Sequence, residues 1–132
     1  MTGVSRSPEP DAVFLPYRWS PNADHFRFVQ CDLNHDLDAL MSVVDSEKPD
    51  YFVNFAAQSM VGESWKYPEH WFMTNVVSTV ALHDRLRQCP FMKRYLSVTT
   101  PEVYRSTDGF ITEDARFNPS TPYAVSRAAC DM

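Results

Sequence analysis

A tyrosine and an arginine near the end of the chain have the spacing of a proton-transfer pair. Pro122 precedes Tyr123, and a proline at the first helical position favours a helix that begins there. Tyr123 and Arg127 then lie four residues apart and project from one face of that helix. A fixed cation beside a phenol stabilises the phenolate and so lowers the pKa of a tyrosine. Such a pair can transfer protons near neutral pH, although a solvated contact between the two side chains is the ordinary alternative.

Polar and small residues follow three predicted strands, at the end where an open parallel sheet binds its ligands. Asp32 and Leu33 follow the first of these strands, residues 54–59 follow the second, and residues 99–102 follow the third. Because the carboxyl ends of parallel strands meet at one edge, we expect these residues to form one site. A structural loop carboxylate and simple packing of the small residues are the ordinary alternatives.

Four motifs, in this order, resemble those of the extended short-chain dehydrogenase/reductase family. They are Asp32-Leu33, Asn54-Phe55-Ala56-Ala57-Gln58-Ser59, Thr99-Thr100-Pro101-Glu102-Val103-Tyr104 and Tyr123-x-x-x-Arg127. The resemblance covers residues from about 26 to 132, and within the family it is strongest to the NAD-dependent nucleotide-sugar 4,6-dehydratases and epimerases. It implies NAD or NADP as cofactor, a nucleotide sugar as substrate, and a homodimer built on two long helices in full-length relatives.

The resemblance also implies which residues contact each ligand. The implied cofactor-binding residues are Asp32, Leu33, Asn54, Phe55, Ala56, Ala57, Thr99, Tyr123 and Arg127, and Arg6 is placed to contact a 2′-phosphate and favour NADP. The implied substrate-binding residues are Ser59, Thr100 and Glu102. In the implied chemistry Tyr123 is the base of the hydride step and Arg127 its electrostatic partner, Thr100 donates to the C4 oxygen of the sugar, and Glu102 removes the C5 proton.

Three residues depart from the family pattern. Pro101 stands where dehydratases carry a residue that can donate a proton, which leaves a 4-epimerase as the alternative to a 4,6-dehydratase. Arg127 replaces the usual lysine; it keeps the charge but brings a larger planar group. Arg105 replaces a glycine, and an arginine is strained there if the backbone needs a positive φ. A non-catalytic remnant or partner-binding fragment is therefore a further alternative.

The elements that must position these residues alternate between strands and helices. Hydrophobic patterning predicts strands over 2–5, 26–30, 51–57 and 95–99, and helices over 36–48, over 69–88 and from 122 onward. The strand over 51–57 is a continuous apolar run, as expected for burial on both faces. We therefore predict the α/β class, as part of a Rossmann-like doubly wound parallel sheet.

The three glycines, Gly3, Gly62 and Gly109, are far apart, so the chain contains no glycine-rich phosphate-binding turn. The first residues are interpreted as the second strand of such a fold, or as a stub of the first strand. We expect residues 1–132 to be the central part of an NAD(P)-binding domain in a longer enzyme. On this interpretation the first strand–loop–helix unit and the C-terminal substrate domain are missing, and the chain alone is inactive.

Composition narrows the remaining function classes. The net charge of −5 argues against nucleic acid as a partner, and no apolar run is long enough to span a membrane. Without a signal pattern the expected location is the cytoplasm. The three cysteines lack a Cys-x-x-Cys pair, and the four histidines lack ligand spacing, so no metal site is expected.

Overall fold

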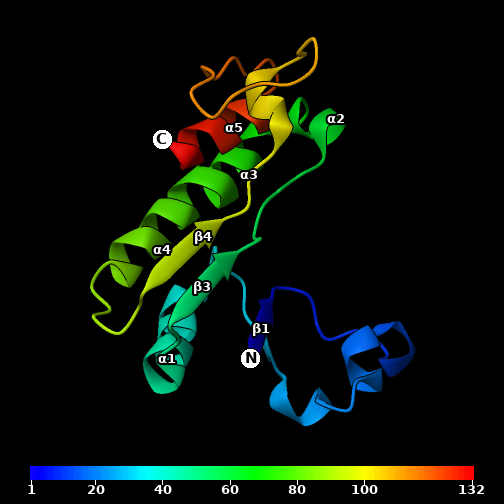
Figure 1. Cartoon of the computed structure of the whole chain (residues 1–132), viewed down its shortest axis with the longest axis vertical. Helices are drawn as coiled ribbons and strands as arrows, with labels where there is room; N and C mark the ends of the chain where they lie inside the picture. The colour runs from blue at the N-terminus through cyan, green and yellow to red at the C-terminus, as the bar shows by residue number, and fades with distance from the viewer.

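The computed structural model describes residues 1–132 and confirms the α/β class (Figure 1). The strands are β1 (Thr2–Ser5), β2 (Arg27–Gln30), β3 (Tyr51–Asn54) and β4 (Arg94–Ser97). The α-helices are α1 (Leu37–Glu47), α2 (Val61–Ser64), α3 (Pro68–Phe72), α4 (Thr79–Leu86) and α5 (Pro122–Asp131). Short 3₁₀ turns cover Ala12–Phe14, Pro16–Trp19, Ala23–His25 and Pro101–Tyr104 (η5). No helix combines the length and the apolar character needed to cross a bilayer.

The strands form two separate parallel pairs instead of one continuous sheet. β1 pairs with β2, with Thr2 opposite Arg27, and β3 pairs with β4, with Tyr51 opposite Arg94. No ladder joins β1 to β3. In a doubly wound sheet of order 3-2-1-4, the second strand pairs with the third and not with the fourth. The pairing of β1 therefore matches the second strand of such a sheet and not the first.

One layer of helices covers both strand pairs. The main core contains buried side chains of α1 and α4 together with the residue that follows β2: Cys31, Leu40, Met41, Val44, Leu82 and Leu86. Val29 of β2, Phe52 of β3 and Tyr95 of β4 pack against this cluster. Helix α1 thus bridges the two pairs and fixes them side by side although no hydrogen bond joins them.

The third and fourth predicted strands, over 51–57 and 95–99, are shorter and more exposed than the sequence suggested. The apolar run 51–57 is a strand only over Tyr51–Asn54, and burial on both faces is wrong for it. Tyr51 is 60% exposed and Val53 47% exposed. The reason is structural: α1 and α4 cover one face of the β3–β4 pair, and the edge of β3 away from β4 has no partner strand.

The predicted helix over 69–88 is confirmed as one continuous helical run with a widened middle. Helices α3 and α4 are joined by a π-helical segment, η4 (Met73–Ser78). A π-helical turn holds one residue more than an α-helical turn, so it rotates the faces on either side of it relative to each other. As a result α3 and η4 contact α5, whereas Leu82 and Leu86 of α4 lie in the core with α1.

The proline-rich segment after β1 folds into 3₁₀ turns that pack against that strand. The rings of Tyr17 and Phe26 lie 4.2 Å apart. A Cβ built on Gly3 would come within 2.6 Å of the Phe26 ring. Gly3 is therefore required by close packing, because the aromatic ring occupies the space that any side chain would need.

Candidate active site

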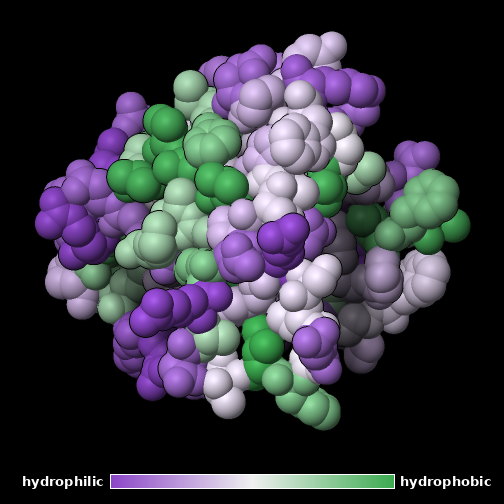
Figure 2. Space-filling view, turned by 90° about the horizontal axis from the view of Figure 1, so that it is seen from above, coloured by the Kyte–Doolittle hydropathy of each residue, from purple (hydrophilic) through white to green (hydrophobic).

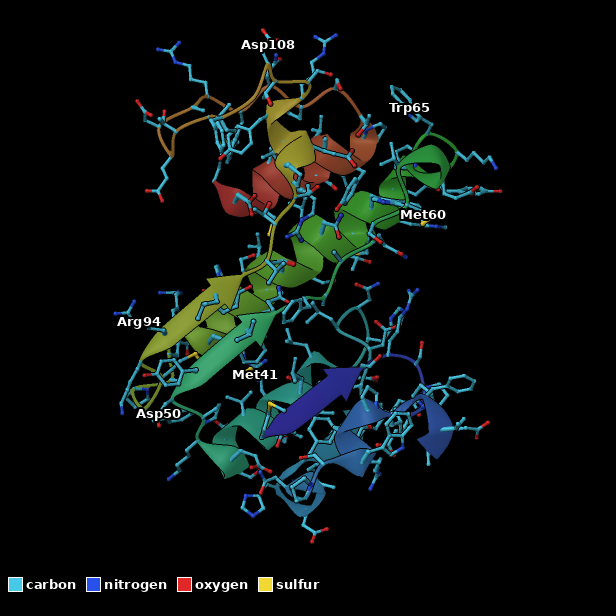
Figure 3. The ribbon with its side chains drawn as sticks, turned by 45° about the vertical axis from the view of Figure 1, so that its right-hand side comes forward. Met41, Asp50, Met60, Trp65, Arg94 and Asp108 are labelled. Carbon is cyan, nitrogen blue, oxygen red and sulfur yellow. The ribbon has the colours of Figure 1, made fainter.

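Helix α5 lies beyond the ends of β3 and β4 (Figure 1), and the predicted site residues of α5, η5 and the segment after β4 meet there. Helix α5 contacts α2, α3, η4 and η5, so segments that are distant in sequence meet around it. The loop after η5, marked by Asp108 in Figure 3, projects away from the strands. The site is therefore built around α5.

The backbone of Tyr123 is fixed by hydroxyl groups on both sides. The Thr121 Oγ1 accepts from Ala124 N at 3.1 Å and so caps α5, as residues at this position commonly do. The Tyr123 N–H donates to Ser64 Oγ at 3.2 Å, and Ser126 Oγ donates to Tyr123 O at 2.8 Å. Tyr123 itself is buried. The first turn of α5 is thus anchored at the residue predicted to transfer a proton.

A buried asparagine connects α5 to the loop after β3. Asn75 Oδ1 accepts from Gln58 N at 2.8 Å, and Asn75 Nδ2 donates to Gln58 O at 3.0 Å and to Ser126 Oγ at 2.9 Å. Asn75 and Ser126 are both fully buried. This network fixes the distance between the Ala56-Ala57 loop and Tyr123.

Arg127 is buried, with a relative exposure of 2%, and no ion pair links it to a carboxylate. Its Nη2 donates to the carbonyl oxygen of Val98, at the end of β4. No hydrogen bond joins it to Tyr123, so the phenol and the guanidinium share a helix face without direct pairing. Arg127 therefore brings an uncompensated positive charge into the site and ties α5 to β4.

Asn54 shapes the loop after β3 from inside. Its Oδ1 accepts from Ala56 N at 3.0 Å, and its Nδ2 donates to the Tyr95 hydroxyl at 2.9 Å. Asn54 is 5% exposed, so both ends of its amide are used within the protein. Burial raises the pKa of Tyr95, and the hydrogen bond from Asn54 opposes that shift. Asn54 thus positions the small residues Ala56 and Ala57, and we assign it no direct ligand contact.

The loop after β2 turns back on itself at Asp32. The Asp32 Oδ1 accepts from Asn34 N at 2.9 Å, while the Asp32 N–H donates to Asp36 Oδ2 at 2.9 Å. Leu33 packs against the main core. Only one oxygen of the Asp32 carboxylate is used by the turn, so the other remains free to accept from a ligand.

Thr100 and Glu102 lie on the short 3₁₀ turn that follows β4. Thr100 Oγ1 accepts from Glu102 N at 3.4 Å, and both side chains are half-buried. Glu102 lines a hollow of about 280 Å³ together with Arg105, Ser106 and Ser120. All four lining residues are polar, which suits a ligand rich in hydroxyl groups.

The remaining predicted residues are less integrated with α5. Thr99 Oγ1 donates to Asp131 Oδ2 on α5, so it faces the site. Phe55 is 75% exposed, and Ser59 and Arg6 are also exposed. The Arg6 side chain makes no hydrogen bond, and its carbonyl oxygen accepts from Gln30 Nε2. The structure therefore brings the α5, η5 and β4 residues together, and leaves Ser59 and Arg6 outside that cluster.

Sequence reasoning missed the polar residues that support the site, namely Ser64, Asn75, Tyr95 and Ser126. Asn75 was detectable, because it falls between Trp71 and Thr79 on the stripe of the helix that is otherwise buried. A polar residue on a buried helical stripe needs an internal partner. Which partner it finds depends on the π-helical rotation, which the sequence pattern does not show.

Comparison with known proteins decides the family. The family model described as GDP-mannose 4,6 dehydratase matches residues 16–132. The chain belongs to this family. A dTDP-glucose 4,6-dehydratase from Xanthomonas campestris pv. campestris is 37% identical over 120 residues, which cover 83% of this chain and 34% of that protein. The resemblance inferred from the four motifs is thereby confirmed.

Solved structures agree with this family assignment. The dTDP-glucose 4,6-dehydratase DesIV from Streptomyces venezuelae, with NAD and TYD bound, is 30% identical with a TM-score of 0.82, over 98% of this chain and 39% of that one. A UDP-glucose-4-epimerase from Stenotrophomonas maltophila, 23% identical, shares the fold with a TM-score of 0.83, over 98% of this chain and 38% of that one. This member of the GDP-mannose 4,6 dehydratase family thus spans about a third of the length of the curated relatives it matches, as the 34% coverage shows.

Proposed function

We propose that this chain is part of an NAD- or NADP-dependent nucleotide-sugar 4,6-dehydratase. Residues 1–132 would form the central part of the cofactor-binding domain of that enzyme. The observation that carries the proposal is the position of Glu102. It lies beside Thr100 on η5, it lines the polar hollow, and η5 packs on the helix that carries Tyr123. A carboxylate at that position can remove a proton from a sugar whose carbonyl oxygen is bound by Thr100.

The residues present fit both ends of a dinucleotide. The free oxygen of Asp32 can accept from an adenine amino group, and Ala56 is exposed and small enough to let a ligand approach the backbone of its loop. At the other end, the buried charge of Arg127 has no carboxylate partner and suits the nicotinamide ribose or a tyrosinate. Arg6 is exposed, and a contact from its side chain to a 2′-phosphate would favour NADP over NAD.

When bound, the nicotinamide would take a hydride from C4 of the sugar and return it later, so the net reaction is loss of water. Tyr123 takes the proton of the C4 hydroxyl as the ketone forms, and the buried Arg127 supplies a positive charge on the same helix. Glu102 then removes the C5 proton, whose electron pair is delocalised into the ketone. The C6 hydroxyl leaves as water with a proton from Glu102 or from a bound water, because Pro101 has none to give.

A 4-epimerase is the second candidate, and Pro101 is the observation that favours it. An epimerase moves a hydride at C4 and needs no elimination, so it needs neither a C5 base nor an acid at C6. In that case Glu102 would serve only to bind the sugar. Tyr123 and Arg127 keep the same roles in both reactions.

Replacing Glu102 distinguishes the two candidates. In a full-length form of the enzyme that includes residues 1–132, supplied with NAD and a nucleotide glucose or mannose, mass spectrometry of the sugar reports the loss of water. We expect Glu102→Gln to lower that loss by about 10²–10⁴-fold, the range for removing a general base. Glu113→Gln, in the exposed loop after η5, is the matched control and keeps the wild-type rate. Unchanged loss of water in Glu102→Gln contradicts the proposal, and inversion at C4 without loss of water supports the epimerase.

A further inference from the structure

A second polar network joins the loop after β2 to the π-helical segment η4, and the proposed function does not use it. Asn34 is at its centre and uses both ends of its side-chain amide. Its Nδ2 donates to Thr74 Oγ1 at 3.0 Å, and its Oδ1 accepts from Ser78 Oγ at 2.8 Å. Both partners belong to η4 and lie 40 and 44 positions further along the chain. Asn34 therefore fixes the loop after β2 to η4 at two points.

The backbone of Asn34 holds the carboxylate of Asp32. The Asn34 N–H donates to Asp32 Oδ1 at 2.9 Å, which leaves the other oxygen of that carboxylate free to accept from a ligand. A ligand on the free oxygen would fix the orientation of the carboxylate, and so also the turn that presents Asn34 to η4. Asn34 thus connects the predicted adenine contact directly to η4.

The next residue of η4 carries the connection onward. Asn75 follows Thr74 in the chain and binds both the loop after β3 and Ser126 of α5. Ser126 Oγ donates in turn to Tyr123 O. A continuous series of hydrogen bonds and helical backbone therefore runs from Asp32 to Tyr123. It passes through a π-helical segment, and such segments are frequent at functional sites.

Most of this connection is shielded from solvent. Ser78 is 6% exposed, Asn75 and Ser126 are fully buried, and Asn34 and Thr74 are half-buried. Figure 2 views the molecule from the end where α5 lies, and its surface there carries hydrophobic patches between hydrophilic residues. Hydrogen bonds removed from water are stronger, and a fully satisfied network makes its members rigid together. A change at one end is thus passed to the other end and not absorbed by water.

We propose that Asn34 is a positioning residue that couples the adenine-binding end of the cofactor site to the helix that carries Tyr123. An adenine nucleotide held by Asp32 fixes Asn34, and Asn34 then holds η4 in the orientation in which Asn75 binds Ser126. Because coupling is reciprocal, order at the α5 end also strengthens binding at the adenine end. The inference rests on the proposed function, since it takes Asp32 as the adenine contact.

Adenosine monophosphate (AMP) tests the coupling, because it carries the adenine but has no nicotinamide that could reach α5 directly. Hydrogen–deuterium exchange is measured in a full-length form of the enzyme that includes residues 1–132. We expect AMP to slow exchange over 32–36 and, by about 3–10-fold, over 122–128, the effect of one hydrogen bond. Asn34→Ala should lose the protection of 122–128 and bind AMP about 3–10-fold more weakly. Asn22→Ala, at an exposed residue, is the control and should behave as the wild type.

Two variants of Thr74 check the same link from the side of η4. Thr74→Val keeps the shape of the side chain but removes the acceptor for Asn34 Nδ2, so it should lose the protection of 122–128 by AMP. Thr74→Ser keeps the hydroxyl group and should retain that protection. If Asn34→Ala does not fold, this pair decides the question.

A purely structural role for Asn34 gives a different result. Urea denaturation would then show lower stability in Asn34→Ala, while AMP would still protect 122–128. That outcome overturns the inference, and so does protection of 32–36 alone in the wild type; in both cases the adenine site at Asp32 stands. If titration calorimetry shows that the wild type binds neither AMP nor NAD, the proposed function fails together with the inference.

Discussion

Asn75 binds both backbone groups of Gln58 with one side chain, at 2.8 Å and 3.0 Å. The two residues are 17 positions apart, and the pair fixes the loop after β3 against the helical run that carries Asn75. A third bond to Ser126 extends the link to α5. The position of Tyr123 relative to the loop after β3 therefore depends on a single buried amide.

Asn75→Ala should be strongly destabilising. It leaves the Gln58 N–H and C=O without a partner inside the protein, so we expect a loss of about 2–3 kcal/mol in the free energy of unfolding. Urea denaturation followed by circular dichroism measures it. Asn118→Ala, at an exposed residue, is the control and should change little. Equal effects of the two substitutions would show that the Asn75 network contributes no stability.

Two glycines should respond to alanine in opposite directions. At Gly3 the new Cβ would meet the Phe26 ring at 2.6 Å, so Gly3→Ala should destabilise by about 1–3 kcal/mol. At Gly62, in α2, nothing lies within 4 Å, so Gly62→Ala should stabilise by about 0.5–1 kcal/mol because alanine favours a helix. Thermal denaturation of both variants compares the signs directly, and a stable Gly3→Ala protein would contradict the packing of Phe26.

Arg105→Gly should stabilise the protein. Arg105 has φ 65° and ψ −158°, a region that is nearly exclusive to glycine, so relief of strain should add about 1–3 kcal/mol. The midpoint of thermal unfolding should rise. Arg105→Ala keeps the strain while removing the charge, and it should not show that rise. If alanine and glycine stabilise equally, the guanidinium and not the backbone is the cause.

Tyr95 should make stability fall at alkaline pH. Burial raises its pKa in the folded state above that in the unfolded state. The native protein therefore retains the phenol proton after the unfolded chain has lost it. This contribution of Tyr95 to the free energy of unfolding is fully present below a pH of about 10. It is lost as the pH rises through the pKa of Tyr95 in the folded state. Urea midpoints measured from neutral to alkaline pH should decline.

Tyr95→Phe isolates this contribution. At neutral pH it should lower stability by about 1 kcal/mol, because Asn54 Nδ2 loses its partner. The decline of stability at alkaline pH should be smaller in the variant than in the wild type. An unchanged decline would assign the effect to other groups.

Much of the fold could be predicted from periodicity and caps. The helices over 37–47 and from Pro122, and the strand at the start of the chain, lie where the pattern placed them. Burial of residues 51–57 was predicted wrongly, because an apolar run does not show whether a partner strand is present. Burial on both faces is a property of the whole sheet and not of one segment.

The candidate site was predictable in its positions but not in its contacts. Motif order placed Asp32, Asn54 and Thr100 at strand ends, where the structure has them. The side-chain directions depend on long-range partners, as in the bond from Asn54 to Tyr95, 41 residues away. The strained backbone at Arg105, expected only if a positive φ was needed, is confirmed.

Because of the π-helical segment Met73–Ser78, the two ends of one long helix contact different neighbours. Removing a single residue from it would restore a regular α-helix and turn α3 by about 100° relative to α4, since each residue advances an α-helix by that angle. Asn75 would then point away from Gln58 while Leu82 kept its place. The segment is thus a fixed rotational offset, set by one extra residue, that keeps the end of the helix that contacts α5 aligned independently of its core end.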